Sequence, residues 1–165
     1  MPSSASAEIT LIDGRSGAGK TVFAAERART EGSHLVSLDD VYPGWDGLDA
    51  GSWHIHHYLL VPRSQGLPGR YRPWLWADAR PGEWVSIPAD RPLIVEGCGA
   101  LRRESIQLAD TRVWLEQDDQ IRRERALGRD GDMYAPHWTR WALQEERFLA
   151  LHESVALATE IQSLG

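Results

Sequence analysis

Short apolar runs alternate with helix-length amphipathic segments along the 165 residues of the chain. The apolar runs predict strands at 8–13, 34–38, 92–96 and 111–115. The intervening patterns predict helices at 20–31, 46–61, 100–109, 117–127 and 137–151. Gly32, Pro62 and Gly128 are expected to end the first, second and fourth of these helices. Residues 150–164 favour a continuation of the last helix, so the pattern itself indicates no fifth strand.

Strands that alternate with helices are typical of a parallel sheet covered by helices on both faces. The chain is therefore predicted to be an α/β protein, and its length fits a single domain over residues 1–165. Residues 62–91 are rich in Pro, Gly, Arg and Trp, and we expect an ordered but irregular excursion there. In such a sheet the carboxyl ends of the strands share one edge, which is where ligands bind.

A phosphate-binding motif lies between the first predicted strand and the first predicted helix. Residues 14–21 match the pattern G-x-x-x-x-G-K-[ST] without departure. Main-chain N–H groups of such a loop and the positive end of the following helix bind phosphates. The motif and its context predict a P-loop NTPase fold, a three-layer sandwich with a parallel sheet of four or five strands. The residues predicted to bind the nucleotide are Gly14, Arg15, Ser16, Gly17, Ala18, Gly19, Lys20 and Thr21.

Lys20 is the only lysine among 18 Lys and Arg residues. A compact ammonium is needed where a point charge must reach the β- and γ-phosphates, and arginine does not replace it there. We therefore expect Lys20 to be catalytic. The hydroxyl of Thr21 is expected to bind Mg²⁺.

Two further predicted strands end in acidic residues. Asp39 and Asp40 follow the second strand, and Glu96 ends the third. A carboxylate beside the γ-phosphate can hold the metal, for which we select Glu96, and another can accept a proton from an attacking hydroxyl, for which we select Asp39. Asp40 remains open as the base, and all three acids could instead cap a turn or a helix.

Arginines recur at helical spacing after the fourth strand. Arg122, Arg125 and Arg129 fall on one face of the predicted helix. Guanidinium groups on a lid over the site would stabilise the charge of a transferring phosphoryl group. We predict an arginine-rich lid at about residues 117–135 with Arg125 and Arg129 catalytic. A solvated charged helix is the alternative.

These motifs together resemble the uridine kinase-like branch of the P-loop nucleoside and metabolite kinases. The resemblance rests on Gly14–Thr21, 37–42, 93–97 and 125–130 and covers roughly residues 8–147. It implies that Asp39 is the catalytic base, that Glu96-Gly97 closes a Walker-B-like strand, and that Arg125, Arg129 and Asp130 belong to the lid. The chain departs from the family in its shorter length and in the missing C-terminal strand. The region of about 42–84 matches no member, so the resemblance does not supply the acceptor.

Aromatic and arginine side chains are dense in the region of about 42–84, which we predict to bind the acceptor. Such residues suit a planar or phosphorylated molecule, although the tryptophans could equally be core. The predicted acceptor residues are Tyr42, Trp45, Tyr71, Arg72, Trp74 and Trp76. A zinc site at His54, His56 and His57 is disfavoured because no acid or cysteine nearby completes a ligand set. Cys98 is expected to be a buried structural thiol.

The sequence thus predicts a kinase that uses ATP and Mg²⁺ to phosphorylate a hydroxyl of a nucleoside-like or other small metabolite. The alternative is a nucleotide-binding or slowly hydrolysing module with a regulatory role. A Ras-type GTPase is disfavoured because an Asn-Lys-x-Asp motif requires a second lysine. The net charge of −6 argues against nucleic acid as a partner. With no bilayer-length apolar run and no leader at 1–8, the chain is expected to be cytoplasmic without a membrane partner, and the sequence carries no indication of oligomeric state.

Overall fold

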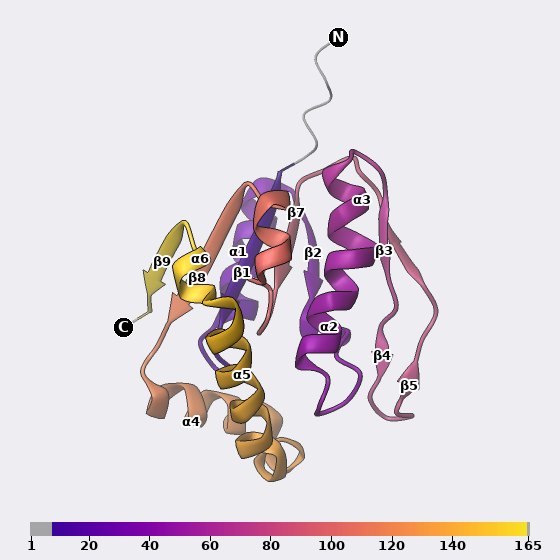
Figure 1. Cartoon of the computed structure of the whole chain (residues 1–165). Coiled ribbons are helices and arrows are strands. Elements are labelled where there is room, and N and C mark those ends of the chain that lie inside the picture. The colour runs from indigo at the N-terminus through magenta and orange to yellow at the C-terminus, as the bar shows by residue number, and fades with distance from the viewer. Residues whose placement is uncertain (1–7, 165) are drawn as a thin grey trace.

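The computed structural model describes residues 8–164 and contains a central parallel sheet of five strands (Figure 1). The strand order is β2-β7-β1-β8-β9, and every neighbouring pair is parallel. Helices cover both faces, which confirms the predicted α/β three-layer fold. The strands are β1 (Ile9–Gly14), β2 (His34–Ser37), β7 (Leu93–Glu96), β8 (Thr111–Glu116) and β9 (Glu160–Ser163).

Two hydrophobic clusters lie on opposite faces of this sheet. On one face, α1 (Lys20–Glu31) packs Ala24 and Ala28 against strand residues such as Ile94. On the other face, α2 (Leu48–Ile55) and α5 (Trp138–His152) contribute to the larger cluster. The two central strands β1 and β7 are buried along their whole length because both of their faces are covered.

The second helix differs from its prediction at Pro62. It continues as α2, a π-helical turn (His56–Leu60) and α3 (Val61–Ser64), so the expectation that Pro62 ends it was wrong. The N–H of Val61 bonds to the carbonyl of His56, five residues back. This wider turn removes the usual clash between a proline ring and the carbonyl four residues earlier, which lets the helix run through Pro62.

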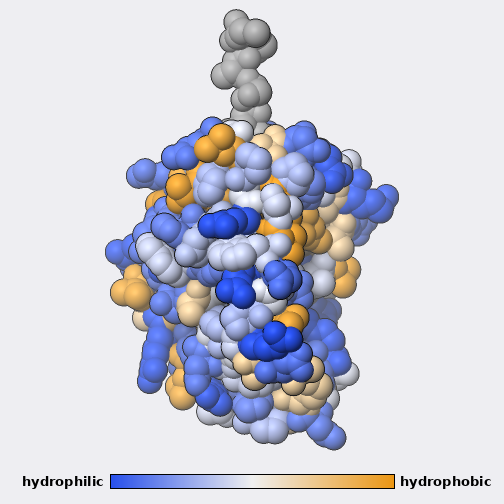
Figure 2. Space-filling model, turned by 90° about the vertical axis from the view of Figure 1, so that its right-hand side faces the viewer, coloured by the Kyte–Doolittle hydropathy of each residue, from blue (hydrophilic) through white to orange (hydrophobic). Residues whose placement is uncertain are grey.

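Residues 69–87 fold back as a β-hairpin beside α2 and α3 (Figure 1). Two short antiparallel ladders form it, β3 with β6 and β4 with β5. The predicted irregular excursion is therefore ordered, as expected, but contains regular strands. On the face of the molecule that carries the hairpin, hydrophilic residues predominate and hydrophobic ones gather in separate places (Figure 2). The strands are β3 (Gly69–Tyr71), β4 (Trp74–Leu75), β5 (Arg80–Pro81) and β6 (Val85–Ile87).

The C-terminal half departs from its prediction at residues 100–109, at Gly128 and at residues 150–164. The helix expected at 100–109 is a shorter 3-10 segment (Arg103–Leu108). The arginine-rich helix α4 (Asp119–Asp130) runs through Gly128, so the expected end there was wrong, and Gly131, with φ of +55°, caps it instead. Two 3-10 turns (Gly131–Met133 and Ala135–His137) connect α4 to α5.

The helix expected over 150–164 is also wrong, because this segment forms α6 (Ser154–Leu157) and then β9. The four residues of β9 are all exposed, so the strand has no alternating apolar pattern that could reveal it in the sequence. Its parallel pairing with β8 runs from Val113–Glu160 to Glu116–Ser163.

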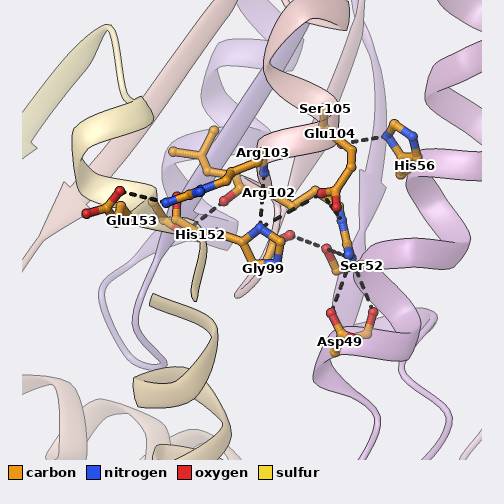
Figure 3. A network of polar contacts seen from close by, with 12 residues as sticks. Asp49, Ser52, His56, Gly99, Arg102, Arg103, Glu104, Ser105, His152 and Glu153 are labelled. Carbon is orange, nitrogen blue, oxygen red and sulfur yellow. Dashed lines mark hydrogen bonds and ion pairs between the residues drawn. The ribbon is translucent and has the colours of Figure 1, made fainter. Parts of the chain in front are cut away.

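A polar network ties the segment after β7 to both α2 and the end of α5 (Figure 3). The buried guanidinium of Arg102 donates to Asp49, Ser52 and Glu104. The main-chain N–H of Arg103 donates to Nδ1 of the buried His152. These bonds fix the end of β7, and with it Glu96, relative to the two helices.

Among residues 8–164, no helix has both the length and the apolar character needed to cross a bilayer. The prediction about a leader falls on residues 1–7, which lie outside the described part of the chain.

Candidate active site

The carboxyl edge of the sheet opens into a cavity of about 770 Å³. Register places Ile12 and Ser37 level with Glu96 across three adjacent strands, so the groups that follow these strands converge. The polar lining comes from the phosphate loop, the ends of β2 and β7, and α4. Its polar residues are Ser16, Lys20, Thr21, Ser37, Asp39, Asp40, Glu96, Arg125, Arg129 and Asp130.

The backbone conformation of the phosphate loop favours the binding of an anion. Gly17 and Gly19 have φ of +81° and +97°, a region that side-chain-bearing residues rarely adopt. Gly19 caps α1, and the first turn of that helix contains no acidic residue. The N–H groups at this helix start lie beside the cavity, where a phosphate would meet both the donors and the positive end of the helix.

Lys20 lies in the loop with 8% of its surface exposed. Its Nζ donates to the carbonyl of Arg15 at 3.0 Å, which holds the ammonium at the cavity wall. Burial opposes the charged form, but the negative groups around it, including Glu96 and Glu145, raise the pKa of Lys20 above its usual value. The ammonium therefore stays charged at neutral pH.

Oxygen ligands for a cation meet where α1 faces the ends of β2 and β7. Oε1 of Glu96 accepts hydrogen bonds from Thr21 Oγ1 at 3.2 Å and from Ser37 Oγ at 2.6 Å. Burial raises the pKa of Glu96, while the Ser37 hydrogen bond and the Lys20 charge oppose that rise. Hard oxygen ligands of this kind fit Mg²⁺. Within residues 8–164 no three His, Cys, Asp or Glu side chains form a metal cage, so a cation here would need phosphate oxygens as well.

Asp39 and Asp40 both line the cavity. The carbonyl of Asp39 accepts a hydrogen bond from Trp76 Nε1 at 3.0 Å, and its Oδ2 lies 3.9 Å from Arg129 Nη2. The pKa of Asp40 is raised by burial and by the neighbouring Asp39 charge. Asp39 thus lies beside Arg129 of α4, which also pairs with Asp130 at 2.9 Å.

The arginines of α4 do not share one environment. Arg125 and Arg129 line the cavity, whereas the side chain of Arg122 is buried and donates to the carbonyl of Ser16 at 3.0 Å and to Asp119. The helix is therefore anchored against the phosphate loop at one end and lies over the cavity further along.

The other wall of the cavity is aromatic. Trp45 stacks on His137 with ring centroids 4.5 Å apart, and lies 5.1 Å from Trp76. Tyr42 is almost fully buried, and its hydroxyl donates to the carbonyl of Cys98 at 2.6 Å. Tyr134 also lines this wall.

Three predicted acceptor residues lie in the hairpin and do not belong to the cavity lining. Arg72 Nε donates to the carbonyl of Gly82, and its main-chain N–H donates to His54 Nε2. Trp74 lies in β4, and Tyr71 pairs with Val85 in the β3–β6 ladder. Their contacts hold the hairpin together and join it to α2.

Sequence reasoning missed two residues that contact the phosphate loop, Tyr134 and Glu145. Tyr134 donates its hydroxyl hydrogen to Ser16 Oγ at 2.8 Å, and Glu145 Oε2 accepts the Ser16 N–H at 2.7 Å. A signal for Glu145 exists, since it follows Trp141 and precedes Phe148 on the apolar face of α5, where a carboxylate needs a partner. Tyr134 lies between two short 3-10 turns and has no comparable signal.

Cys98 lines the cavity and is buried, and its Sγ lies 3.4 Å from Glu145 Oε2. Burial raises the pKa of the thiol well above its usual value, so the group stays protonated and is a poor nucleophile.

Comparison with solved structures agrees with this architecture. A protein named as a possible uridine kinase, from Bacillus stearothermophilus, aligns with a TM-score of 0.66 and 16% identity over 94% of this chain and 88% of its own. The shikimate kinase of Bacteroides thetaiotaomicron aligns with a TM-score of 0.52 and 12% identity over 93% of this chain and 85% of its own.

The chain thus has the fold of the P-loop kinases. At these identities the likeness establishes the fold and does not select the uridine kinase-like branch. No protein-family model matches the chain, and no curated protein sequence matches it either.

Proposed function

We propose that this protein is an ATP-dependent small-molecule kinase that transfers the γ-phosphoryl group to a hydroxyl of a nucleoside-like or other small metabolite. One observation carries the proposal: a single cavity contains the phosphate loop, an acid at the end of β2, an acid at the end of β7 and two arginines of α4. The same cavity extends from the phosphate loop to an aromatic wall that includes Trp45 and Trp76, and this wall is our candidate surface for the acceptor.

In the proposed reaction the phosphates of ATP lie on the loop at 14–21 and on the ammonium of Lys20. The oxygens of Thr21 and Glu96 would hold Mg²⁺, which when bound neutralises phosphate charge. Asp39 accepts the proton of the acceptor hydroxyl. The hydroxyl oxygen forms a bond to the γ-phosphorus, the bond from that phosphorus to the β–γ bridging oxygen breaks, and ADP leaves.

The arginines of the lid would act late in the proposed reaction. Arg125 and Arg129 lie on the cavity side of α4, where guanidinium groups can bind the oxygens of the transferring group as charge spreads over them. Arg129 would leave its 3.9 Å contact with Asp39 to do so while Asp130 stays within 2.9 Å of it, and the Asp39 carboxylate is then free of that arginine.

The test is whether ATP consumption depends on an acceptor. Purified protein is incubated with ATP·Mg²⁺ and pools of hydroxyl-bearing metabolites, and ADP and phosphorylated products are measured by mass spectrometry. We expect at least one pool to raise ADP formation and to yield a product heavier by one phosphoryl group. ADP formation at the same rate with and without every pool would favour the slowly hydrolysing module instead.

A further inference from the structure

Ser16 is held at all three of its polar groups by one segment of the chain. Its N–H donates to Glu145, its carbonyl accepts from Arg122, and its hydroxyl accepts from Tyr134, at 2.7, 3.0 and 2.8 Å. These partners lie more than 100 residues further along the sequence. All of them belong to α4, α5 or the turns between them, and α4 also carries the two lid arginines.

The main chain of α4 lies directly against the phosphate loop at the same place. A Cβ built on Gly17 would come within 2.0 Å of the carbonyl oxygen of Arg122. Because a helical turn advances 5.4 Å, Arg125 and Arg129 lie about one and two turns beyond this contact. A change in the position of Ser16 would therefore act on the helix at its fixed end and would displace the arginines over the cavity.

The identity of residue 145 is otherwise hard to explain. Glu145 has 4% of its surface exposed and lies next to a loop that would bind a polyanion, where a buried carboxylate adds repulsion. Arg15, with its Nε 3.7 Å from Glu145 Oε1, offsets the charge in part, as does the nearby ammonium of Lys20. A carboxylate here is tolerable if its hydrogen bond to the Ser16 N–H is what orients the loop relative to α5.

We propose that Ser16 couples the phosphate loop to the lid, and that Tyr134 and Glu145 are positioning residues that set where Arg125 and Arg129 lie when a nucleotide binds. This inference rests on the proposed function, because it assumes that the loop binds a nucleotide. It goes further because it makes the position of the lid depend on the three hydrogen bonds of Ser16.

The test compares wild-type protein with Tyr134→Phe in the presence of a non-hydrolysable ATP analogue and Mg²⁺. The substitution removes the hydroxyl and keeps the ring, which packs against Trp45 and Trp138. Calorimetry measures nucleotide affinity, and hydrogen–deuterium exchange measures protection of residues 119–130. Tyr58→Phe, on the far side at the hairpin near Trp84, is the matched control.

In the wild type and in the control, nucleotide should slow exchange in residues 119–130. In Tyr134→Phe this protection should fall by about two- to tenfold, the size expected for one lost hydrogen bond, while affinity changes less than about threefold. Glu145→Gln keeps an oxygen for the Ser16 N–H and should retain the protection, whereas Glu145→Ala should lose it. A role confined to folding would lower the unfolding midpoint without separating affinity from protection.

The outcomes are distinguishable. If wild-type protein does not bind the nucleotide, the proposed function fails and this inference fails with it. If wild type binds and Tyr134→Phe is protected as fully as wild type, the inference alone is overturned. Should Glu145→Ala not fold, the result for Tyr134→Phe still decides.

Discussion

Replacement of Lys20 by methionine tests the phosphate site most directly. The substitution keeps an unbranched chain of similar length and removes the ammonium whose Nζ donates to the carbonyl of Arg15. One charge-assisted hydrogen bond contributes about 1.5–3 kcal/mol, so the loss of a single phosphate contact should raise the Kd for ATP about 10- to 150-fold. If the ammonium reaches both the β- and the γ-phosphate, the loss should be larger still.

Stability should respond much less than affinity. The variant removes one hydrogen bond and leaves Glu96 and Glu145 without the neighbouring positive charge, but it also removes the burial of an ammonium with 8% exposure. These contributions oppose each other. We therefore expect a denaturant midpoint close to that of the wild type, which makes a loss of binding interpretable.

Isothermal titration calorimetry with ATP·Mg²⁺ measures the affinity, and urea unfolding checks the fold. Arg29→Met is the matched control, because it removes a positive charge from the same helix at a site that is 76% exposed. Lys20→Arg should also bind poorly, because the larger planar guanidinium does not fit a site that closely surrounds an ammonium. A folded Lys20→Met protein that binds ATP within about threefold of wild type would refute our account of the loop.

Five further substitutions test other parts of the site and fold. Asp39→Asn should keep ATP affinity and lose about 10²–10⁴ in kcat, measured as acceptor-dependent ADP release, whereas Asp40→Asn should be milder. Arg125→Ala should lower kcat with little change in KM for ATP, because lid arginines act on transition-state charge. Trp76→Phe removes the hydrogen bond to the Asp39 carbonyl and should raise the acceptor KM severalfold while ATP binding is unchanged. His152→Gln should weaken the pH dependence of stability, measured as urea midpoints between pH 5 and 8. Burial lowers the pKa of His152 in the folded state. Its contribution to the free energy of unfolding is therefore present above about pH 6.5 and is lost as pH falls through the lower pKa of the folded state.

Each of these expectations has a contrary result. A crippled Asp40→Asn beside a nearly normal Asp39→Asn would reassign the base. If Arg125→Ala turns over at the wild-type rate, α4 is a solvated charged helix and not a catalytic lid. An unchanged acceptor KM in Trp76→Phe would place the acceptor elsewhere. For the histidine, the slope should shrink without vanishing, since burial also lowers the pKa of His54 and His56, and an unchanged slope would contradict the reasoning.

The fold could be predicted from sequence where local pattern and tertiary role agree. β1 and β7 are mostly apolar because both of their faces are buried, and Gly32 ends α1 in a left-handed conformation that glycine adopts without strain. β9 escaped prediction because its side chains are exposed, so only main-chain pairing with β8 defines it. Pro62 misled because a π-helical turn five residues long accommodates its ring.

The candidate site also contains residues that the sequence predicts and residues that it does not. The phosphate loop is a contiguous motif, and Asp39 and Glu96 follow from the rule that parallel strands end at one edge. The contacts of Ser16 with Arg122, Tyr134 and Glu145 join residues more than 100 positions apart, and no local pattern specifies such a pairing. Tyr71 and Trp74 were predicted for the cavity and do not line it, because a dense aromatic cluster in the sequence carries no information about which of its members face the cavity.

The solitary lysine has a practical consequence for handling the protein. Since Lys20 is the chain's one side-chain amine and lies buried in the phosphate loop, amine-reactive dyes and aldehyde or activated-ester resins that reach a side chain must react within that loop itself. Immobilisation by that chemistry would inactivate whatever it attaches through the side chain. The same restriction is useful: acylation of Lys20, followed by mass spectrometry with and without ATP, would report site occupancy from one peptide.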